Sequence, residues 1–464
     1  MEKKTASNKI LWIFAIGQLG WSTLAGIISN WLVFFFQPSN EELLKGQTEF
    51  IPQGTFLGLT VIGLITAFGR IFDAITDPFI ASKSDSLKHK LGRRIPFMRG
   101  AAVPFGVITV LMFLSPVNGT SKVNAVVLFI CAMLFYLCMT AYCTPYNALI
   151  PELGRTQNNR INISTYISVT YFVGTAAAYL VPNIAGLFME SLGYAGSFRV
   201  TVAILAVFAV ICMSIPAYLI DENTYADTTP STESAAASLS STFKNKDFRL
   251  FVASDILYWI ALTLFQTGLS FYITVLMRLD AAMTFPLFAI MTFTSFVCYV
   301  PVNFLAKKLG KKKLVSFAFL FFAVTFLVTG FAGLLPIPSL VYGIMVAVLA
   351  AIPMAILGVL PQAVVADIAE SDMIKTCESR QGMFYAARTF AFKLGQSAAM
   401  LLFTSIAVIN RDVPFGQTGY GLGYRITAFV AAALCLMGGL VFIRYNEKSV
   451  ISVIESNSEK REDN

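Results

Sequence analysis

The sequence predicts an all-α membrane protein with twelve transmembrane helices in two six-helix repeats. Of its 464 residues, 56% are hydrophobic and 13% are charged, against about 45–50% and about 25% in soluble domains. Unbroken apolar runs of about 20 residues, the length that crosses a hydrocarbon core, recur along the chain. A short basic loop occurs once in each half. These features exclude a soluble or disordered protein, and the unbroken runs argue against a β-barrel, whose strands alternate.

Each apolar run is expected to form one helix, because only helices of this length satisfy their backbone groups in lipid. The first run follows a basic N-terminus and is too long for a signal peptide, so it is expected to be an uncleaved span. The twelve runs lie at 10–36, 54–82, 100–118, 122–152, 163–188, 198–220, 249–277, 282–306, 314–336, 340–368, 381–410 and 424–445.

The runs define the expected domains. Residues 1–220 form an N-terminal six-helix bundle and residues 249–445 a C-terminal one. Residues 221–248 are polar and rich in Ser, Thr and Ala, which is typical of a flexible linker, here cytoplasmic. Residues 446–464 form a cytoplasmic tail that ends in a solvated run of charges.

Lysine and arginine predict the orientation. With both termini in the cytoplasm, cytoplasmic segments hold 25 of the 34 Lys and Arg residues, and the opposite side holds six. The other three, Arg70, Arg388 and Lys393, lie inside predicted spans. We therefore expect a multi-pass protein of the cell (inner) membrane. This placement also accounts for the net charge of +8 without a nucleic-acid partner.

The basic loop relates the two halves. It reads KLGRR at 90–94, between the second and third runs, and KLGKK at 308–312, between the eighth and ninth, an offset of 218 residues. A repeated six-helix unit of parallel topology is typical of the major facilitator fold.

The second run carries charges that are costly in lipid, at least about 2.5–3.5 kcal/mol each. Arg70, Asp73 and Asp77 recur at i, i+3 and i+7, so they share one helix face. Counting back from Lys83 at about 1.5 Å per residue, Asp73 lies about 15 Å inside, near the bilayer midplane.

The two carboxylates suggest a cation site. Asp73 and Asp77, with the hydroxyls of Thr76 and Thr140, offer oxygen ligands, which suit hard cations. The aspartates are thus candidate ligands of Na⁺, or one of them carries a coupling proton. The sequence leaves Na⁺ and H⁺ open. The alternative is a salt bridge with Arg70 that only packs the helix, although two acids against one base leave a negative charge for a cation.

Three other runs bring polar side chains to a similar depth, which suits a solute site between two repeats. The alternative role for Lys393 is a structural counter-charge to the aspartates, and the alternative role for Arg388 is helix packing or a gate pair. Asp255 is expected to be a gate residue near the cytoplasmic end of its helix, and Asp367 to pair with a loop cation. The residues expected to contact the solute or to couple it to the cation are Lys393, Arg388, Trp21, Ser22, Cys143, Asn147 and Tyr146.

Three motifs, in order, resemble the glycoside–pentoside–hexuronide:cation symporters, the family that includes melibiose permease. They are GRIFDAITDP at 69–78 followed by LGRR at 91–94, PYNALIPE at 145–152 followed by Asn159 and Arg160, and ADI at 366–368 followed by RQGMFY at 380–385 and KLG at 393–395. The resemblance covers most of the chain and implies the major facilitator fold.

The resemblance implies that Asp73, Thr76, Asp77 and Thr140 form the cation site and that Lys393 links it to the substrate site. The charged sugar ligands of melibiose permease do not carry over, since Ser22, Cys143, Asn147 and roughly Ser168 stand at their places. A uronate or a different glycoside is therefore expected. The related sodium-dependent lysophospholipid symporter shares the DAxTDP pattern and also lacks the sugar carboxylates.

These features predict a symporter that couples Na⁺ or H⁺ to uptake of a glycoside, oligosaccharide or hexuronide. A lysolipid symporter of the same fold is the alternative. No enzymatic activity is expected, because no loop holds a catalytic cluster, and the absence of a GxxxxGK[ST] motif excludes an ATP-driven pump. The seven Cys form no CxxC pair or Cys/His cluster, so no zinc site or other cofactor is expected. The expected partners are the solute, the cation and the bilayer, with a monomeric chain.

Overall fold

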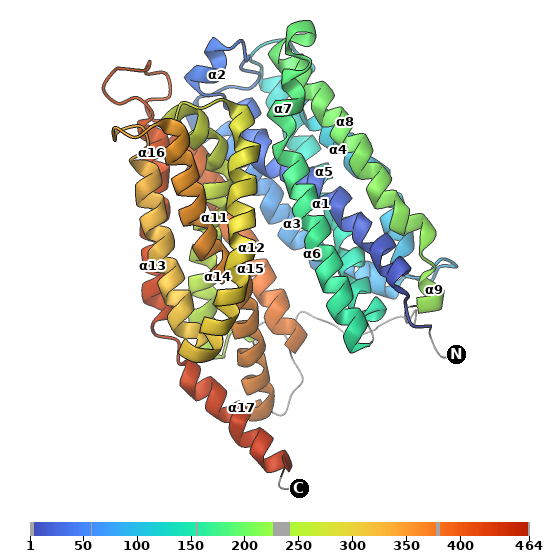
Figure 1. Ribbon diagram of the computed structural model, residues 1–464. Helices are drawn as coiled ribbons and strands as arrows, with labels where there is room; N and C mark the ends of the chain where they lie inside the picture. Colours follow the sequence, from blue (N-terminus) through green and yellow to red (C-terminus); the bar gives the residue numbers. More distant parts are fainter. Residues whose placement is uncertain (1–3, 57, 155, 226–241, 377–380, 463–464) are drawn as a thin grey trace. The chain divides into compact units, whose positions relative to one another are not determined.

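The computed structural model describes residues 4–56, 58–154, 156–225, 242–376 and 381–462, which are nearly all helical (Figure 1). The chain divides into two compact units, Met1–Glu233 and Ser234–Asn464. Most of the predicted linker, 226–241, lies outside the described residues, and so does Arg380 of the third motif.

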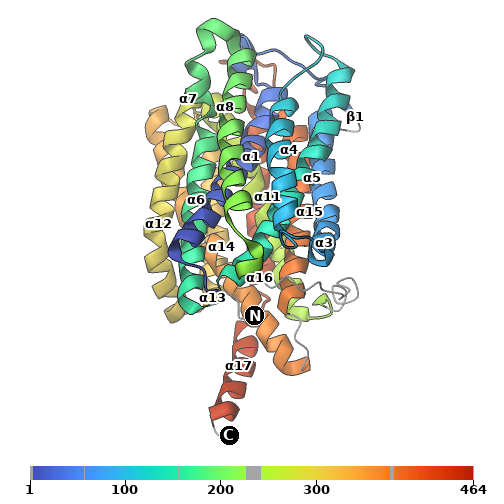
Figure 2. The same ribbon diagram turned by 90° about the vertical axis from the view of Figure 1, so that its right-hand side faces the viewer.

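Unit 1 is a bundle of long helices with short connecting elements (Figure 2). A two-stranded antiparallel hairpin pairs Thr55 with Thr60 immediately before α3. The elements are α1 (Asn8–Phe36), α2 (Asn40–Leu44), β1 (Thr55–Phe56), β2 (Leu59–Thr60), α3 (Val61–Ser86), α4 (Ile95–Met112), α5 (Lys122–Leu153), α6 (Gln157–Tyr179), α7 (Val181–Gly186), α8 (Met189–Leu219) and α9 (Glu222–Tyr225).

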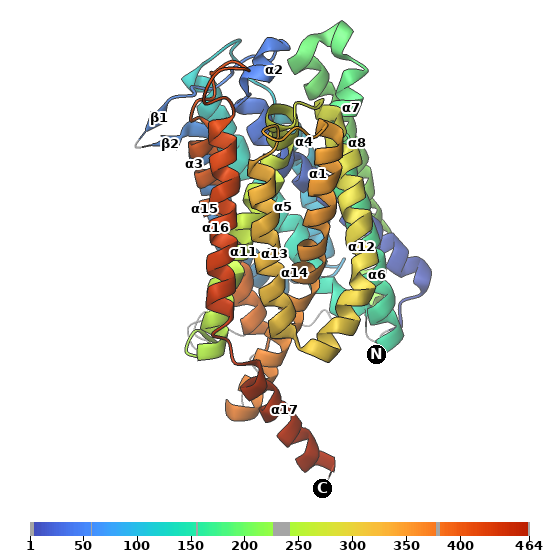
Figure 3. The same ribbon diagram turned by 60° about the vertical axis from the view of Figure 1, so that its left-hand side comes forward.

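Unit 2 is a second bundle of long helices (Figure 3). Its first long helix ends in a π-helical turn. The elements are α11 (Lys246–Phe271), the π-helix η1 (Tyr272–Leu276), the 3₁₀-helix η2 (Ala281–Met283), α12 (Thr284–Leu309), α13 (Lys311–Gly330), α14 (Ser339–Thr376), α15 (Gln381–Ala407), α16 (Leu422–Phe442) and α17 (Glu447–Glu462).

The long helices of the two units pack in the same order. In unit 1, α1 packs on α6 and α8, α5 packs on α3 and α4, and α4 packs on α8. In unit 2, α11 packs on α15 and α16, α14 packs on α12 and α13, and α13 packs on α16. Each unit therefore has a first helix against its last two, and a fourth helix against its second and third.

Eleven helices of the described residues are long and apolar enough to cross a membrane. The sequence predicts twelve spans, and α3 is the difference. It has 26 residues, about 39 Å at 1.5 Å per residue. Its interior charges, Arg70, Asp73 and Asp77, leave it outside the apolar criterion. The same residues therefore exclude α3 from the apolar spans and make it the candidate site helix.

Several element ends differ from the apolar runs. The run 54–82 begins with the hairpin, and α3 starts only at Val61, where the side chain of Thr60 accepts the N–H of Gly63 and caps the helix. Helix α8 begins at Met189, nine residues before its run, and it is kinked at Gly193, whose φ of 66° and ψ of 179° are not helical. The charged tail is largely helix α17, with Val450 buried. Hydrophobicity marks the membrane part of a helix, not its polar ends.

Candidate functional site

The candidate cation site lies where α3 packs on α5 in unit 1. Asp73 and Asp77 are four residues apart on α3, so their side chains lie one above the other on one face. Asp73 is fully buried, whereas Asp77 is partly exposed. Pro78 follows directly and cannot donate to the carbonyl of Ala74, which loosens the helix beside the carboxylates.

Helix α5 supplies one hydroxyl to each carboxylate. Thr140 Oγ1 donates to Asp73 Oδ1 at 2.8 Å, and Thr144 Oγ1 donates to Asp77 Oδ1 at 3.1 Å. The two threonines are also one turn apart, so the pairs form two rungs between the helices. Thr76 Oγ1 lies 3.5 Å from Thr140 Oγ1 and donates to the carbonyl of Phe72 at 2.9 Å. The predicted set Asp73, Thr76, Asp77 and Thr140 is thus one cluster.

This cluster suits a hard monovalent cation or a proton. A hydroxyl that donates to a carboxylate keeps lone pairs that can face a cation. The cluster has two carboxylates, and no group of three or more His, Cys, Asp or Glu that could hold a metal occurs in the described part of the chain. The donor atoms are oxygens, which are the ligands of Na⁺-like hard ions and not of soft metals.

Arg70 takes part in other contacts. Its Nη2 donates to Ser29 Oγ on α1 at 3.2 Å, and its guanidinium lies 5.3 Å from the ring centre of Tyr136 on α5. Gly69 permits this arrangement, because a Cβ there would lie 2.3 Å from the Tyr136 ring. Arg70 therefore contributes to the packing of α3 on α1 and α5.

Five predicted solute contacts lie on α1 and α5, and four of them, Ser22, Cys143, Tyr146 and Asn147, divide into two kinds. Tyr146 is fully buried, stacks on Phe14 at 4.1 Å and donates its hydroxyl to the Phe14 carbonyl at 2.8 Å. Ser22 is buried and donates to the Leu19 carbonyl. These contacts favour packing roles for both. By contrast, Cys143 is partly exposed and Asn147 is exposed.

Trp21 lies on α1 with its ring 6.2 Å from that of Tyr171 on α6. Its indole N–H is buried and has no acceptor among the described residues. Buried indole N–H groups usually have a hydrogen-bond acceptor. The indole N–H of Trp21 is therefore available to an acceptor on a bound molecule.

In unit 2, Arg388 on α15 forms a bidentate ion pair with Asp255 on α11. Its Nε lies 2.7 Å from Asp255 Oδ2 and its Nη2 lies 3.0 Å from Oδ1, and both side chains are buried. This ion pair favours a gate or packing role for Arg388, with Asp255 as its partner. Lys393 lies five residues further along α15 and is partly exposed. The neighbouring Phe392 stacks on Trp259 of α11 at 4.6 Å.

The repeated basic loop starts the third long helix of each unit. In unit 1, Glu222 accepts the backbone N–H groups of Arg93 at 2.9 Å, Arg94 at 2.8 Å and Ile95 at 2.9 Å. Arg94 also donates to Glu152 on α5 at 2.5 Å. A carboxylate at a helix N-terminus both satisfies orphan N–H groups and complements the helix dipole.

Unit 2 repeats this arrangement. Glu447 accepts the N–H groups of Lys311 at 2.7 Å and Lys312 at 3.1 Å. The Lys311 ammonium pairs with Asp367 on α14 at 2.5 Å, so the predicted pairing of Asp367 with a loop cation is confirmed. Gly92 and Gly310 precede the two helix starts with φ of 101° and 86°, which glycine adopts without strain.

Sequence reasoning did not assign roles to Thr144, Glu222 or Glu447. Thr144 follows Thr140 by one turn, which is a readable signal once Asp73 and Asp77 are assigned. Each glutamate stands two residues after the last apolar run of its half, at 220 and 445, so its position repeats with the loop.

A sequence model of the family described as MFS/sugar transport protein matches residues 13–449. The chain belongs to this family. Curated relatives of this MFS/sugar transport protein include an uncharacterized symporter of Synechocystis, 32% identical over 157 residues, which are 32% of this chain and 29% of the relative. An isoprimeverose transporter of Lactiplantibacillus pentosus is 28% identical over 28% of this chain and 26% of its own length.

A third relative is the sodium-dependent lysophosphatidylcholine symporter 1 of Xenopus tropicalis, 33% identical over 24% of this chain and 21% of its own length. Each of these matches spans less than a third of the relative. A solved structure of a proton-dependent oligopeptide transporter superposes with a TM-score of 0.66 at 12% identity, covering 97% of this chain and all of the other. At 12% identity, this likeness shows only that the two chains share a fold.

Proposed function

We propose that the chain is a secondary active symporter that couples Na⁺ or H⁺ to uptake of a sugar-like solute, a glycoside, oligosaccharide or hexuronide, by alternating access. The observation that carries the proposal is the pair of rungs Asp73–Thr140 and Asp77–Thr144. The family and its relatives named as symporters support the same activity. A cation that binds between the aspartates neutralises the pair, which frees Lys393 to turn toward the solute.

We further propose that α3 is a twelfth span, so that each unit contributes six helices. The matching packing order of the two units supports this count. A membrane-spanning α3 would hold its charges against α5 and α1, where hydroxyls and the Tyr136 ring solvate them in place of water. Both termini then lie in the cytoplasm, as the Lys and Arg distribution predicts.

The solute set that we propose is Lys393, Trp21, Cys143 and Asn147, with Arg388 and Asp255 as a gate pair. The indole N–H of Trp21, which has no acceptor in the described part of the chain, suits a hydroxyl or carboxylate of a sugar. Ser22 and Tyr146 shape the site through packing.

Lysolipid transport is a second candidate. A relative named as a sodium-dependent lysophosphatidylcholine symporter is 33% identical over 117 residues, and the charged sugar ligands of melibiose permease are absent here. A lysolipid needs no carboxylates to bind sugar hydroxyls, so the absence of these carboxylates fits lysolipid transport. It fits transport of a uronate or a different glycoside as well.

Uptake into proteoliposomes tests the proposal. Glucuronate, a neutral disaccharide and lysophosphatidylcholine are compared under an imposed Na⁺ gradient, an H⁺ gradient or none. We expect gradient-driven accumulation of one solute, lost in Asp73→Asn and kept in Asp412→Asn, a matched change at an exposed position. Full coupling in Asp73→Asn would contradict the assignment of Asp73 to the cation site. Accumulation of lysolipid alone would replace the sugar assignment.

A further inference from the structure

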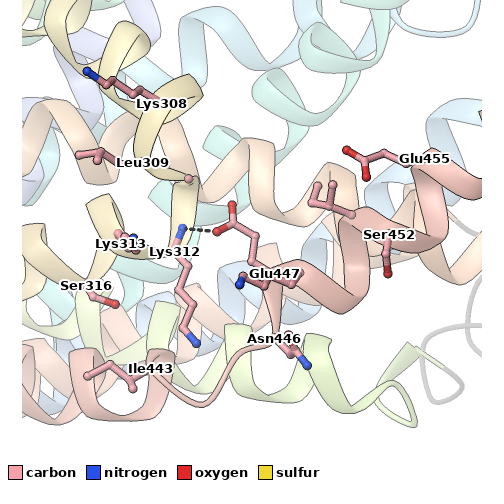
Figure 4. A pocket seen from close by; sticks show the side chains of 13 residues that line it. Lys308, Leu309, Lys312, Lys313, Ser316, Ile443, Asn446, Glu447, Ser452 and Glu455 are labelled. Carbon is pink, nitrogen blue, oxygen red and sulfur yellow. Dashed lines mark hydrogen bonds between the residues drawn. The ribbon is translucent and has the colours of Figure 1, made fainter.

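Unit 2 holds a basic pocket where the α12–α13 corner meets α17. Its volume is about 890 Å³, enough for a phospholipid headgroup, and Figure 4 shows its lining. Helix α12 ends at Leu309 and α13 begins at Lys311, so the pocket stands at the end of two spans. It therefore lies at the level where a bilayer places its phosphates.

The charges of the pocket favour an anion. Four lysines line it and two glutamates, Glu447 and Glu455, oppose them, which leaves two net positive charges. Glu447 is already engaged, since it accepts the N–H groups of Lys311 and Lys312 (Figure 4 draws the second contact). The lysines have no ion pair in the described part of the chain, unlike Lys311, which pairs with Asp367. They are Lys308, Lys312, Lys313 and Lys448.

A neutral donor points to the same ligand. The hydroxyl of Ser316 lines the pocket, is buried, and has no hydrogen-bond partner among the described residues. Buried hydroxyls are rarely left without a partner. A phosphate oxygen would accept this hydroxyl together with the ammonium groups.

The rim of the pocket is apolar. Leu309 and Ile443 line it and are 44% and 53% exposed. Other exposed apolar side chains lie on the same helices, among them Phe304 on α12 and Leu440 on α16, which are 67% and 66% exposed. A soluble phosphate would make no contact with such a rim, whereas the acyl chains of a lipid would pack along it.

We propose that this pocket binds the phosphate of an anionic phospholipid, with the acyl chains along α12 and α16. Basic pockets at the cytoplasmic ends of membrane helices suit such headgroups. The site is separate from the cation cluster of unit 1 and does not depend on the proposed transport activity.

The test measures binding of fluorescent phosphatidylglycerol and phosphatidylcholine to the full chain in detergent. The pocket variant is Lys312→Gln/Lys313→Gln/Lys448→Gln. The control, Lys244→Gln/Lys307→Gln/Lys375→Gln, loses the same charge at exposed positions outside the pocket. At about fivefold per lysine, the pocket variant should bind phosphatidylglycerol about a hundredfold more weakly. The control should bind it as the native chain does.

A second arm separates the two sources of phosphate. Inorganic phosphate and glycerol phosphate are added as competitors of the fluorescent lipid. We expect neither compound to displace the lipid below millimolar concentration. Displacement at micromolar phosphate would overturn the lipid assignment in favour of a soluble anion. Equal binding by the native chain, the pocket variant and the control would overturn the site. Thermal unfolding without lipid checks that the pocket variant is folded, and a single Ser316→Ala variant tests the pocket without changing charge.

Discussion

At the scale of single residues, the α3–α5 contact separates what the sequence shows from what only packing shows. The spacing of Asp73 and Asp77 predicts their common face, and both lie on it. The spacing of Thr140 and Thr144 predicts a stripe, but not that each hydroxyl meets one carboxylate at 2.8 and 3.1 Å. That depends on the register of two helices whose paired residues lie 67 positions apart in the chain, which periodicity within one helix does not carry.

The Thr140 hydroxyl should be necessary for cation affinity. Thr140→Val keeps the shape but removes a hydroxyl oxygen that can ligate the cation, and a polar contact to a charged group is worth about 1.5–3 kcal/mol. We expect the half-saturating concentration of the coupling cation in uptake assays to rise at least about tenfold. Thr140→Ser keeps the hydroxyl and should stay close to the native value. An unchanged cation dependence in Thr140→Val would remove Thr140 from the site.

The buried pair Asp255–Arg388 should behave as a unit. Removing one partner leaves an uncompensated buried charge, which costs about 3–5 kcal/mol. We expect Arg388→Gln to lower the thermal unfolding midpoint of the purified protein markedly. The double variant Asp255→Asn/Arg388→Gln should recover most of this loss. Additive losses in the double variant would show that the two side chains contribute independently.

At the scale of elements, hydrophobicity predicts the helices well and their polar ends poorly. The run 122–152 matches α5 within one residue. The run 54–82 misses the hairpin at 55–60, because Thr, Phe, Leu and Thr there are as apolar as the helix that follows. The starts of α4 and α13 depend on glutamates far along the chain, and no local propensity encodes them.

Gly92 should be the critical residue of the α4 start. An added Cβ would lie 2.3 Å from Glu222 Oε2, and the φ of 101° is strained for any other residue. We expect Gly92→Ala to lower the unfolding midpoint of the purified protein. Its cost should be smaller in a Glu222→Gly background, where no side-chain atom of residue 222 remains against the added Cβ.

Gly100→Ala is the matched control for this prediction, since no atom lies within 4 Å of its added Cβ and α4 is helical there. It should be neutral or slightly stabilising, because alanine favours helix by about 1 kcal/mol over glycine. Equal losses at the two glycines would contradict the clash.

At the scale of the whole molecule, the repeat was visible in the sequence only at one loop. KLGRR and KLGKK have the same spacing of glycine and basic residues, and both precede a helix held by a glutamate. No motif described above repeats along the apolar helices that share the packing order. Self-similarity of sequence therefore survives where backbone geometry is demanding and is lost where many apolar residues serve equally well.

The predicted orientation gives a labelling test. In a background without native cysteines, Thr120→Cys lies in the loop after α4 and Ser449→Cys lies in α17, and both positions are exposed. A membrane-impermeant maleimide should label Thr120→Cys in intact cells, and Ser449→Cys only after the membrane is opened. Labelling of both in intact cells would contradict twelve spans with cytoplasmic termini.

The two glutamate caps also bear on biosynthesis. The N–H of Arg93 meets its acceptor 129 residues later in the chain, and that of Lys311 meets its acceptor 136 residues later. At about 5–20 residues per second, a ribosome needs on the order of ten seconds to make the missing glutamate. During that interval the basic loop faces water and the translocation machinery with its helix start open. In each unit, the glutamate cap of the third long helix therefore forms only after the last long helix has been synthesised. The two units thus complete their folding one after the other.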